Sequence, residues 1–125
     1  MTISYRERAF GHDELKPVSG GYSDVWGGVG MTLVDSLDTL YVMDMKEEFE
    51  EACTWVIDHL DMTSDQNVSV FEYNIRLLGG LLSAYDLSGL EKAKEVGQLL
   101  KVAFTDELTF PTVISFFFSS FVVQN

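Results

Sequence analysis

The sequence has little cysteine, proline or positive charge, and each shortage excludes a class of protein. The single cysteine, Cys53, cannot form an internal disulfide, and its apolar neighbours favour a buried structural thiol over a reactive one. Only 8 Lys and Arg residues oppose 20 Asp and Glu residues, and the net charge of -12 argues against nucleic acid and anionic membrane surfaces as partners. With 2 Pro and 46% hydrophobic residues, the chain is expected to be globular.

Long hydrophobic runs are also missing. The longest apolar stretch, Val113 to Val123, is interrupted by serines and is far shorter than the roughly 20 residues that a membrane-spanning helix needs. The first residues lack the basic segment and apolar core of a signal peptide. We therefore expect neither a membrane helix nor a targeting signal in this sequence. Its 125 residues suffice for one modest hydrophobic core.

Apolar residues recur at helical spacing along most of the chain. The segment from Gly11 to Gly30 is expected to be a loop, because it is rich in glycine and contains Pro17. No segment before residue 110 alternates convincingly with the period of two that is typical of strands. The pattern predicts an all-α fold of successive antiparallel helix pairs, with helices over residues 4–10, 31–45, 46–60, 69–85 and 90–104.

Two charged residues lie in the most apolar of these helices, the one expected to begin near Ser69. Glu72 and Arg76 are four residues apart, and burying either charge costs free energy unless it has a partner or a function. A structural interpretation is a capping box of Ser69 and Glu72, with Glu72 and Arg76 as an ion pair. A chemical interpretation makes Glu72 a proton donor or base and Arg76 a substrate contact. Because the helix is apolar on nearly all sides, we expect both charges to face an interior.

Gly79 and Gly80 interrupt the same helix near its middle. A glycine in a helix interior costs roughly 1 kcal/mol relative to alanine. Close approach of another helix or of a ligand would explain why two adjacent glycines are kept there, whereas loose packing would not.

Two further groups of polar residues have structural and functional interpretations. Asp35 and Asp38 are placed to act as an acid/base or metal-binding pair, but two carboxylates alone make a poor calcium site, and capping or bridging to an arginine is favoured. The run His12-Asp13-Glu14 either lines a site or belongs to a surface loop.

Three blocks of sequence together resemble a known enzyme family. They are residues 9–17 (AFGHDELKP), residues 30–41 (GMTLVDSLDTLY) and residues 70–85 (VFEYNIRLLGGLLSAY). In this order and with these separations they resemble the class I α-1,2-mannosidases, glycoside hydrolase family 47. The resemblance covers about residues 4–104.

The resemblance implies a fold and an activity. The family fold is an (α/α)7 barrel, of which residues 1–104 would be an N-terminal part. The implied reaction is the hydrolysis, with inversion, of terminal α-1,2-linked mannose from the high-mannose N-glycans of glycoproteins, with bound Ca²⁺, in the endoplasmic reticulum or the Golgi. The acid catalyst of the family falls on Glu72 and a substrate-binding arginine falls on Arg76. An inverting glycosidase also needs a second carboxylate, about 6.5–9.5 Å away, to activate water.

The departures from the family pattern qualify this expectation. The family barrel is several times longer than this chain, and its other acidic catalysts and its Ca²⁺-binding threonine have no counterpart here. Residues 105–125 form a Phe-rich tail that diverges from the family and is expected to lie outside the domain. We therefore expect an inactive fragment of a mannosidase. The alternatives are a non-catalytic relative that recognises glycans or assists degradation, and a helical interaction domain in which Glu72 only caps a helix.

Overall fold

The computed structural model describes residues 3–62, 67–88 and 113–115. This part of the chain is mostly helical, as the sequence predicts. The helices are α1 (Ile3–Arg8), α2 (Met31–Asp35), α3 (Leu37–Val42), α4 (Lys46–His59), α5 (Val70–Glu72), the π-helix η1 (Tyr73–Leu78) and α6 (Gly79–Ser88). The predicted helix over 90–104 lies outside the described residues.

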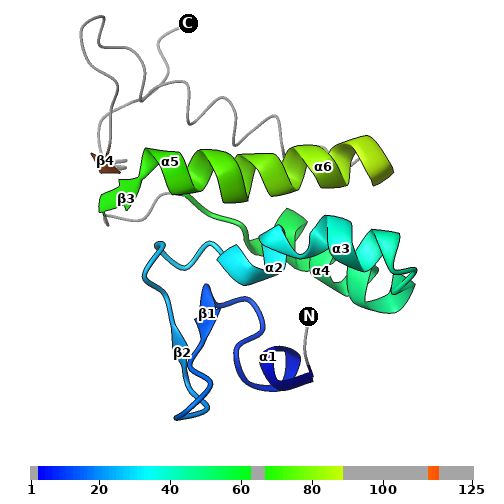
Figure 1. The fold of residues 1–125 in the computed structure, drawn as a ribbon, viewed down its shortest axis with the longest axis horizontal. Coiled ribbons are helices and arrows are strands. Elements are labelled where there is room, and N and C mark those ends of the chain that lie inside the picture. The colour runs from blue at the N-terminus through cyan, green and yellow to red at the C-terminus, as the bar shows by residue number, and fades with distance from the viewer. Residues whose placement is uncertain (1–2, 63–66, 89–112, 116–125) are drawn as a thin grey trace, which may run out of the picture.

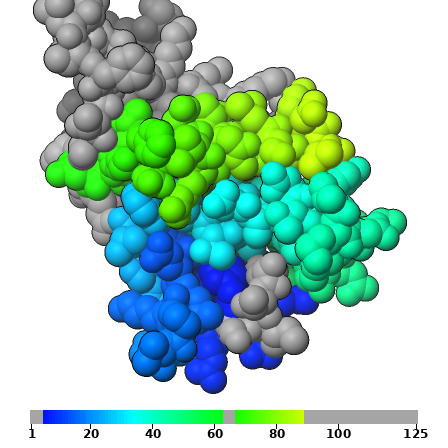
Figure 2. Space-filling view, viewed as in Figure 1, coloured from blue at the N-terminus to red at the C-terminus, as the bar shows by residue number. Residues whose placement is uncertain are grey.

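The helices are arranged in layers (Figure 1). The segments α5, η1 and α6 run on as one long helix, which lies along one side of α2, α3 and α4. Helix α1 and a small hairpin lie on the opposite side of that middle layer. The space-filling view shows the same order, with the long helix packed directly against the middle layer (Figure 2).

The hydrophobic core fills the space between the long helix and the middle layer. Apolar side chains from α2 and α3 meet those of η1 and α6 there, as the helical spacing predicts. All of the following are at most 1% exposed: Leu33, Leu37, Leu40, Tyr73, Leu77 and Leu81.

Two short antiparallel sheets correct the expectation of an all-α fold. Strands β1 (Glu14–Leu15) and β2 (Tyr22–Ser23) pair inside the segment that was expected to be a plain loop. Strands β3 (Asn67–Ser69) and β4 (Val113–Ser115) pair so that Val68 faces Ile114. Strands of two or three residues are too short to show a period of two, which is why the sequence pattern missed them.

The helix predicted over residues 31–45 is divided in two at Ser36. The Ser36 side chain donates a hydrogen bond from Oγ to the carbonyl oxygen of Leu33 at 2.9 Å, and its backbone N–H reaches the same oxygen at 3.3 Å. A hydroxyl that binds the preceding turn competes with the regular i→i+4 ladder. The result is α2 followed at once by α3.

The start of α2 is fixed by a glycine. Gly30 has a φ of +66°, and a Cβ atom built on it would lie 2.6 Å from the ring of Trp55 on α4. Both the backbone conformation and the contact therefore require glycine. Through this contact α4 holds the loop that leads into α2.

The long helix begins where the sequence predicts and contains the expected close approach. Ser69 caps it, because its hydroxyl accepts a hydrogen bond from the Glu72 amide at 3.3 Å. A Cβ atom on Gly80 would lie 3.0 Å from the carbonyl oxygen of Val34 in α2, whereas one on Gly79 would have only an ordinary contact at 3.5 Å with Asn74. Gly80 thus lets the long helix pack against the backbone of α2, which confirms the prediction of a close helix contact.

No helix in the described ranges is long and apolar enough to cross a membrane. Several large apolar side chains of the long helix and of α3 remain exposed, with Val42 at 74% and Phe71 at 65%. An exposed apolar face of this kind is typical of a surface that packs against further structure.

The two adjacent glycines give a matched test of this packing. We expect Gly80→Ala to lower the melting temperature, because the new methyl group meets a backbone carbonyl that has no room to move. Gly79→Ala should leave the melting temperature unchanged or raise it, since alanine is favoured over glycine by roughly 1 kcal/mol in a helix. Thermal unfolding followed by circular dichroism measures both, and equal melting temperatures for the two variants would contradict the proposed contact.

Candidate active site

Glu72 and Arg76 lie side by side on the long helix. The Nε atom of Arg76 is 2.7 Å from Oε2 of Glu72, so the expected i,i+4 ion pair is present. Oε2 is shielded from solvent, yet no hydrogen bond of good geometry reaches it from the described residues. A buried carboxylate oxygen normally has such a bond. The oxygen is therefore held by its ion pair with Arg76 and not by a well-aligned hydrogen bond.

The two charges are less buried than the sequence suggested. The exposed fraction of the side chain is 25% for Glu72 and 38% for Arg76. Ile75 and Leu82, which were expected to surround them with apolar structure, are themselves about half exposed, at 49% and 50%. The pair thus lies at the edge of the core and is accessible from outside.

Trp26 is the second residue, after Glu72, that contacts the Arg76 guanidinium. The Cζ atom of Arg76 lies 5.5 Å from the centroid of the Trp26 ring, within the range of a cation–π contact. The Trp26 indole donates from Nε1 to Oε1 of Glu14 at 3.2 Å. Its backbone carbonyl accepts a hydrogen bond from the Tyr73 hydroxyl. Trp26 is therefore hydrogen-bonded to Glu14 of the hairpin and to Tyr73 of the long helix.

Asp13 fixes the loop that carries Trp26. Its side chain is fully buried and accepts hydrogen bonds from three backbone amides, those of Trp26 at 2.8 Å, Gly28 at 2.9 Å and Met31 at 3.1 Å. The sequence left Asp13 undecided between a site and a surface loop, because its donors lie 13 to 18 residues further on. The glycines of that loop were the one signal that could have indicated a buried acceptor.

His12 and Asp24 extend this cluster to the hairpin. Oδ2 of Asp24 lies 2.9 Å from Nδ1 of His12, and Oδ1 accepts a hydrogen bond from the Asp13 amide at 3.1 Å. The His12 ring stacks on the ring of Tyr22, with a centroid distance of 3.4 Å. These contacts order the loop around Asp13, and none of them involves the Glu72 carboxylate.

Asp35 and Asp38 do not act as a pair. Oδ2 of Asp38 accepts a hydrogen bond from the Ser83 hydroxyl at 2.9 Å, so Asp38 links α3 to α6, in line with the favoured structural role. Partial burial raises the pKa of Asp35; the nearby Arg76 guanidinium lowers it, and the charges of Asp38 and Glu72 raise it again. Asp35 therefore shares the electrostatic environment of the Glu72–Arg76 pair.

The described residues do not fit a calcium site. Within residues 3–62, 67–88 and 113–115, no three His, Cys, Asp or Glu side chains come together in a way that could hold a metal ion. Ca²⁺ needs six to eight oxygen ligands. No chemical step on these residues is therefore assigned to a metal.

Cys53 is not a candidate nucleophile. It is half-buried on α4, and this burial, followed by the charge of Glu50, raises the pKa of its thiol to about 11. Such a thiol is almost entirely protonated at neutral pH. The structure supports the expectation of an inert thiol, although the side chain is only partly buried.

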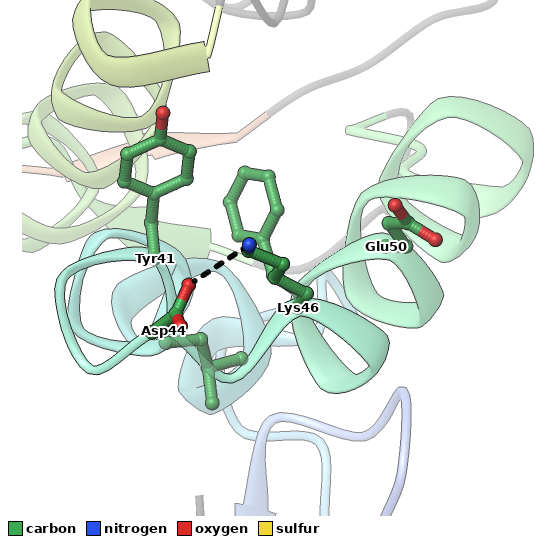
Figure 3. Close-up of a pocket in the computed structure, with 6 residues that line it drawn as sticks. Tyr41, Asp44, Lys46 and Glu50 are labelled. Carbon is green, nitrogen blue, oxygen red and sulfur yellow. Dashed lines mark ion pairs between the residues drawn. The ribbon is translucent and has the colours of Figure 1, made fainter.

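Two shallow hollows lie elsewhere on the surface. One, of about 480 Å³, is bounded by Tyr41, Asp44, Lys46 and Glu50, and an ion pair of 3.3 Å joins Lys46 to Asp44 across it (Figure 3). The other, of about 440 Å³, lies between α3 and α6. Neither is lined by Glu72 or Arg76. The candidate site is the ion pair and not the larger hollow, because the pair supplies a carboxylate that can transfer a proton and a guanidinium that can bind a ligand.

Comparison with known proteins assigns the family. Residues 3–117 match the family model described as glycosyl hydrolase family 47. The chain belongs to this family. The match includes all of the Glu72–Arg76 site. It also runs past the predicted division at residues 104 and 105, which remains a prediction.

The family 47 chain is similar to several named mannosidases. It is 50% identical over 111 residues to the endoplasmic reticulum mannosyl-oligosaccharide 1,2-alpha-mannosidase of Rattus norvegicus, which covers 86% of this chain and 17% of the rat protein. It is 54% identical over 108 residues to mannosyl-oligosaccharide 1,2-alpha-mannosidase IA of Sus scrofa, covering 81% and 16%. A solved alpha-1,2-mannosidase from Trichoderma reesei matches with a TM-score of 0.80 and 34% identity, over 90% of this chain and 27% of that structure. The chain thus spans less than a third of each.

The buried carboxylate of the family 47 chain can be tested with an isosteric change. We expect Asp13→Asn to destabilise the fold, because the amide keeps one acceptor oxygen and points its NH₂ group at a backbone donor. Each lost bond to a charged acceptor costs about 1.5–3 kcal/mol. Urea unfolding measures the loss. Glu7→Gln, at an exposed acid of α1, is the control, and equal stability of the two variants would contradict the role given to Asp13.

The pKa of Asp35 predicts a pH dependence of stability. Because its pKa is raised above the ordinary value of 3.8, the folded chain binds this proton more tightly than the unfolded chain does. The stabilisation is therefore complete below 3.8 and is lost as the pH rises through the higher folded pKa. Asp35→Asn should remove this loss and give a flatter melting-temperature profile between acidic and neutral pH. Since Asp35 is largely exposed, the effect is expected to be small.

Asp58→Asn, at an exposed position of α4, is the matched control for this measurement. Identical profiles for Asp35→Asn and Asp58→Asn between acidic and neutral pH would contradict a raised pKa of Asp35 in the folded chain.

Proposed function

We propose that this chain is one wall of the catalytic centre of a mannosyl-oligosaccharide α-1,2-mannosidase, an inverting glycosidase. Its substrate would be terminal α-1,2-linked mannose on the high-mannose N-glycans of glycoproteins. The observation that carries the proposal is the Glu72–Arg76 ion pair at the edge of the core, in a chain of glycosyl hydrolase family 47. The helix layers support a partial (α/α)7 barrel, which further helices would complete over the exposed apolar face.

In this proposal Glu72 is the general acid. Cleavage of a glycosidic bond needs a proton on the departing oxygen as positive charge develops on the sugar ring. Glu72 is the carboxyl group proposed to deliver that proton, and the Arg76 Nε atom lies 2.7 Å from its Oε2. The carboxylate is anchored through its own backbone, since the Glu72 amide is bound by Ser69. The capping and catalytic interpretations of Glu72 are therefore compatible.

Arg76 is proposed to bind the substrate. Its Nε atom contacts Glu72, while neither terminal nitrogen of its guanidinium pairs with a carboxylate in the described part of the chain. Nη1 and Nη2 are fixed donors that suit the oxygen atoms of a sugar. With 38% of its side chain exposed, Arg76 is accessible to a ligand that approaches the long helix from outside.

The chain alone is proposed to be inactive. An inverting mechanism needs a second carboxylate about 6.5–9.5 Å from the acid to activate water. The chain covers 17% of the rat mannosidase, and the described residues do not fit a calcium site. We therefore propose that the base, and the Ca²⁺ that the family resemblance implies, belong to parts of a longer protein.

The names of the relatives also suggest a location. The rat and human relatives are named endoplasmic reticulum mannosidases, and the human protein is 52% identical over 104 residues. By this similarity we propose that the protein works in the secretory pathway, in the endoplasmic reticulum or the Golgi.

A non-catalytic role is the second candidate. Arg76 has donors available for a sugar, and binding alone needs no second carboxylate. A relative that binds glycans or assists degradation would use Arg76 without turnover by Glu72. Glycan binding that survives Glu72→Gln unchanged, without release of mannose by any form of the protein, would favour this candidate.

The proposed roles are tested by two measurements on the purified chain. Incubation with a high-mannose glycan should release no mannose, as measured by chromatography. Titration with α-1,2-mannobiose, followed through the NMR signals of the sugar, should show binding at millimolar sugar, and in the unsubstituted chain it should also shift the Arg76 Nε–Hε signal. Arg76→Ala should abolish the binding, and Arg6→Ala, which removes an arginine paired with Glu48 and Glu51, should not.

The outcomes separate the parts of this proposal. Release of mannose that is lost in Glu72→Gln would contradict the claim of inactivity while supporting Glu72 as the acid. Equal binding by the Arg76→Ala and Arg6→Ala variants would contradict the role of Arg76.

A further inference from the structure

We propose that Glu14 is a positioning residue for Arg76 and acts through the indole of Trp26. This inference rests on the proposed function, because Arg76 is the group proposed to bind the sugar. Glu14 lies on β1, far in the sequence from the long helix, and does not itself contact the guanidinium. Its effect is to hold the surface against which the guanidinium rests.

The Arg76 guanidinium is bounded on two sides by groups of known position. On one edge, its Nε atom lies 2.7 Å from Glu72 Oε2. On one face, the Trp26 ring centroid lies 5.5 Å from its Cζ atom. The ion pair alone leaves the planar guanidinium free to change its orientation through the side-chain torsions that precede Nε. The indole face restricts that turn, and with it the direction of Nη1 and Nη2.

The backbone and the ring of Trp26 are held by different groups. The backbone N–H is bound to the buried Asp13 carboxylate at 2.8 Å, and the carbonyl accepts from the Tyr73 hydroxyl. Neither bond fixes the side-chain torsions of Trp26. The ring itself is anchored by its hydrogen bond from Nε1 to Glu14 Oε1 at 3.2 Å, the one polar contact of the indole in the described part of the chain.

Glu14 is well placed for this task. It belongs to a hairpin strand in which its backbone pairs with Ser23 of β2, so its Cα position is set by the sheet. A carboxylate that accepts from the indole N–H also increases the electron density of the ring, which strengthens the attraction between the ring face and a cation. Glu14 thus contributes chiefly the orientation of the ring to the Trp26–Arg76 contact.

The alternative is that Glu14 only stabilises the hairpin. Under that alternative, removing its carboxylate lowers the melting temperature but leaves Arg76 in place. A positioning role instead predicts a change at Arg76 itself, which lies far in the sequence from Ser23 and Trp26, the two residues that Glu14 contacts. A melting temperature cannot separate the two, whereas a signal from the guanidinium can.

The experiment uses the full ¹⁵N-labelled chain without ligand and follows two NMR signals, Arg76 Nε–Hε and Trp26 Nε1–H. Glu14→Ala should displace both signals, because the indole loses its anchor. Glu14→Gln should restore both, since the amide oxygen still accepts from the indole. Glu48→Ala, which removes a surface carboxylate paired with Arg6, is the control and should move neither.

The proposal is overturned if Glu14→Ala moves the Trp26 signal but leaves the Arg76 signal where Glu48→Ala leaves it. Should Glu14→Ala fail to fold, Trp26→Phe takes its place. It keeps Glu14 and an aromatic ring but removes the indole N–H, so the Arg76 signal should move, and an unmoved signal overturns the proposal equally.

A titration with α-1,2-mannobiose separates this inference from the proposed function. If both hold, Glu14→Ala weakens binding about two- to fivefold, in keeping with the loss of a partly exposed cation–π contact, and Glu14→Gln does not. If the wild-type chain binds no mannobiose, the proposed function fails, while the ligand-free Arg76 signal still decides whether Glu14 positions it.

Discussion

The buried carboxylate of Asp13 is the interaction on which the rest of the site depends. It is 0% exposed, and a charge in that position is tolerated only because three backbone amides point at it. Those amides belong to Trp26, Gly28 and Met31, which lie along the turn from β2 into α2. One carboxylate therefore sets both the position of Trp26 and the first residue of α2. Without the Asp13 carboxylate, this glycine-rich turn would lose the three hydrogen bonds that hold it in one conformation.

The position of α2 in turn determines where Arg76 lies. The long helix packs on α2 at Gly80, where the absent side chain lets it approach to within van der Waals distance of the Val34 carbonyl. The Tyr73 hydroxyl binds the Trp26 carbonyl and so ties the same helix to the turn that Asp13 holds. Two separate connections, the Tyr73 hydrogen bond at the start of η1 and the packing at Gly80 just beyond its end, thus fix η1 on both sides. Arg76 belongs to this π-helical segment, and π-turns are frequent at functional sites.

The sequence predicted the parts of this arrangement that are local and missed those that join distant segments. The cap at Ser69, the Glu72–Arg76 pair and the close contact at Gly80 all depend on spacings within one helix, so the pattern of residue types is sufficient to find them. Asp13 acts on residues 13 to 18 positions later, and no helical or strand period relates them. Trp26 meets Arg76 only through the tertiary fold. The degree of burial was also overestimated, because an apolar sequence does not show which of its faces is covered.

Because the Glu72–Arg76 ion pair is partly exposed, the contacts around it fix the geometry of the two side chains more than the pair itself does. Exposed ion pairs contribute only about 0–1 kcal/mol, so the 2.7 Å contact between Glu72 and Arg76 cannot by itself hold two long side chains in one geometry. Packing on the Trp26 ring and the capped backbone at Ser69 supply the missing restraint. If further helices closed a barrel over the pair, as we propose, water would be excluded and the two charges would interact more strongly. The Glu72 carboxylate and the Arg76 guanidinium would then be enclosed together at the position proposed for the chemistry.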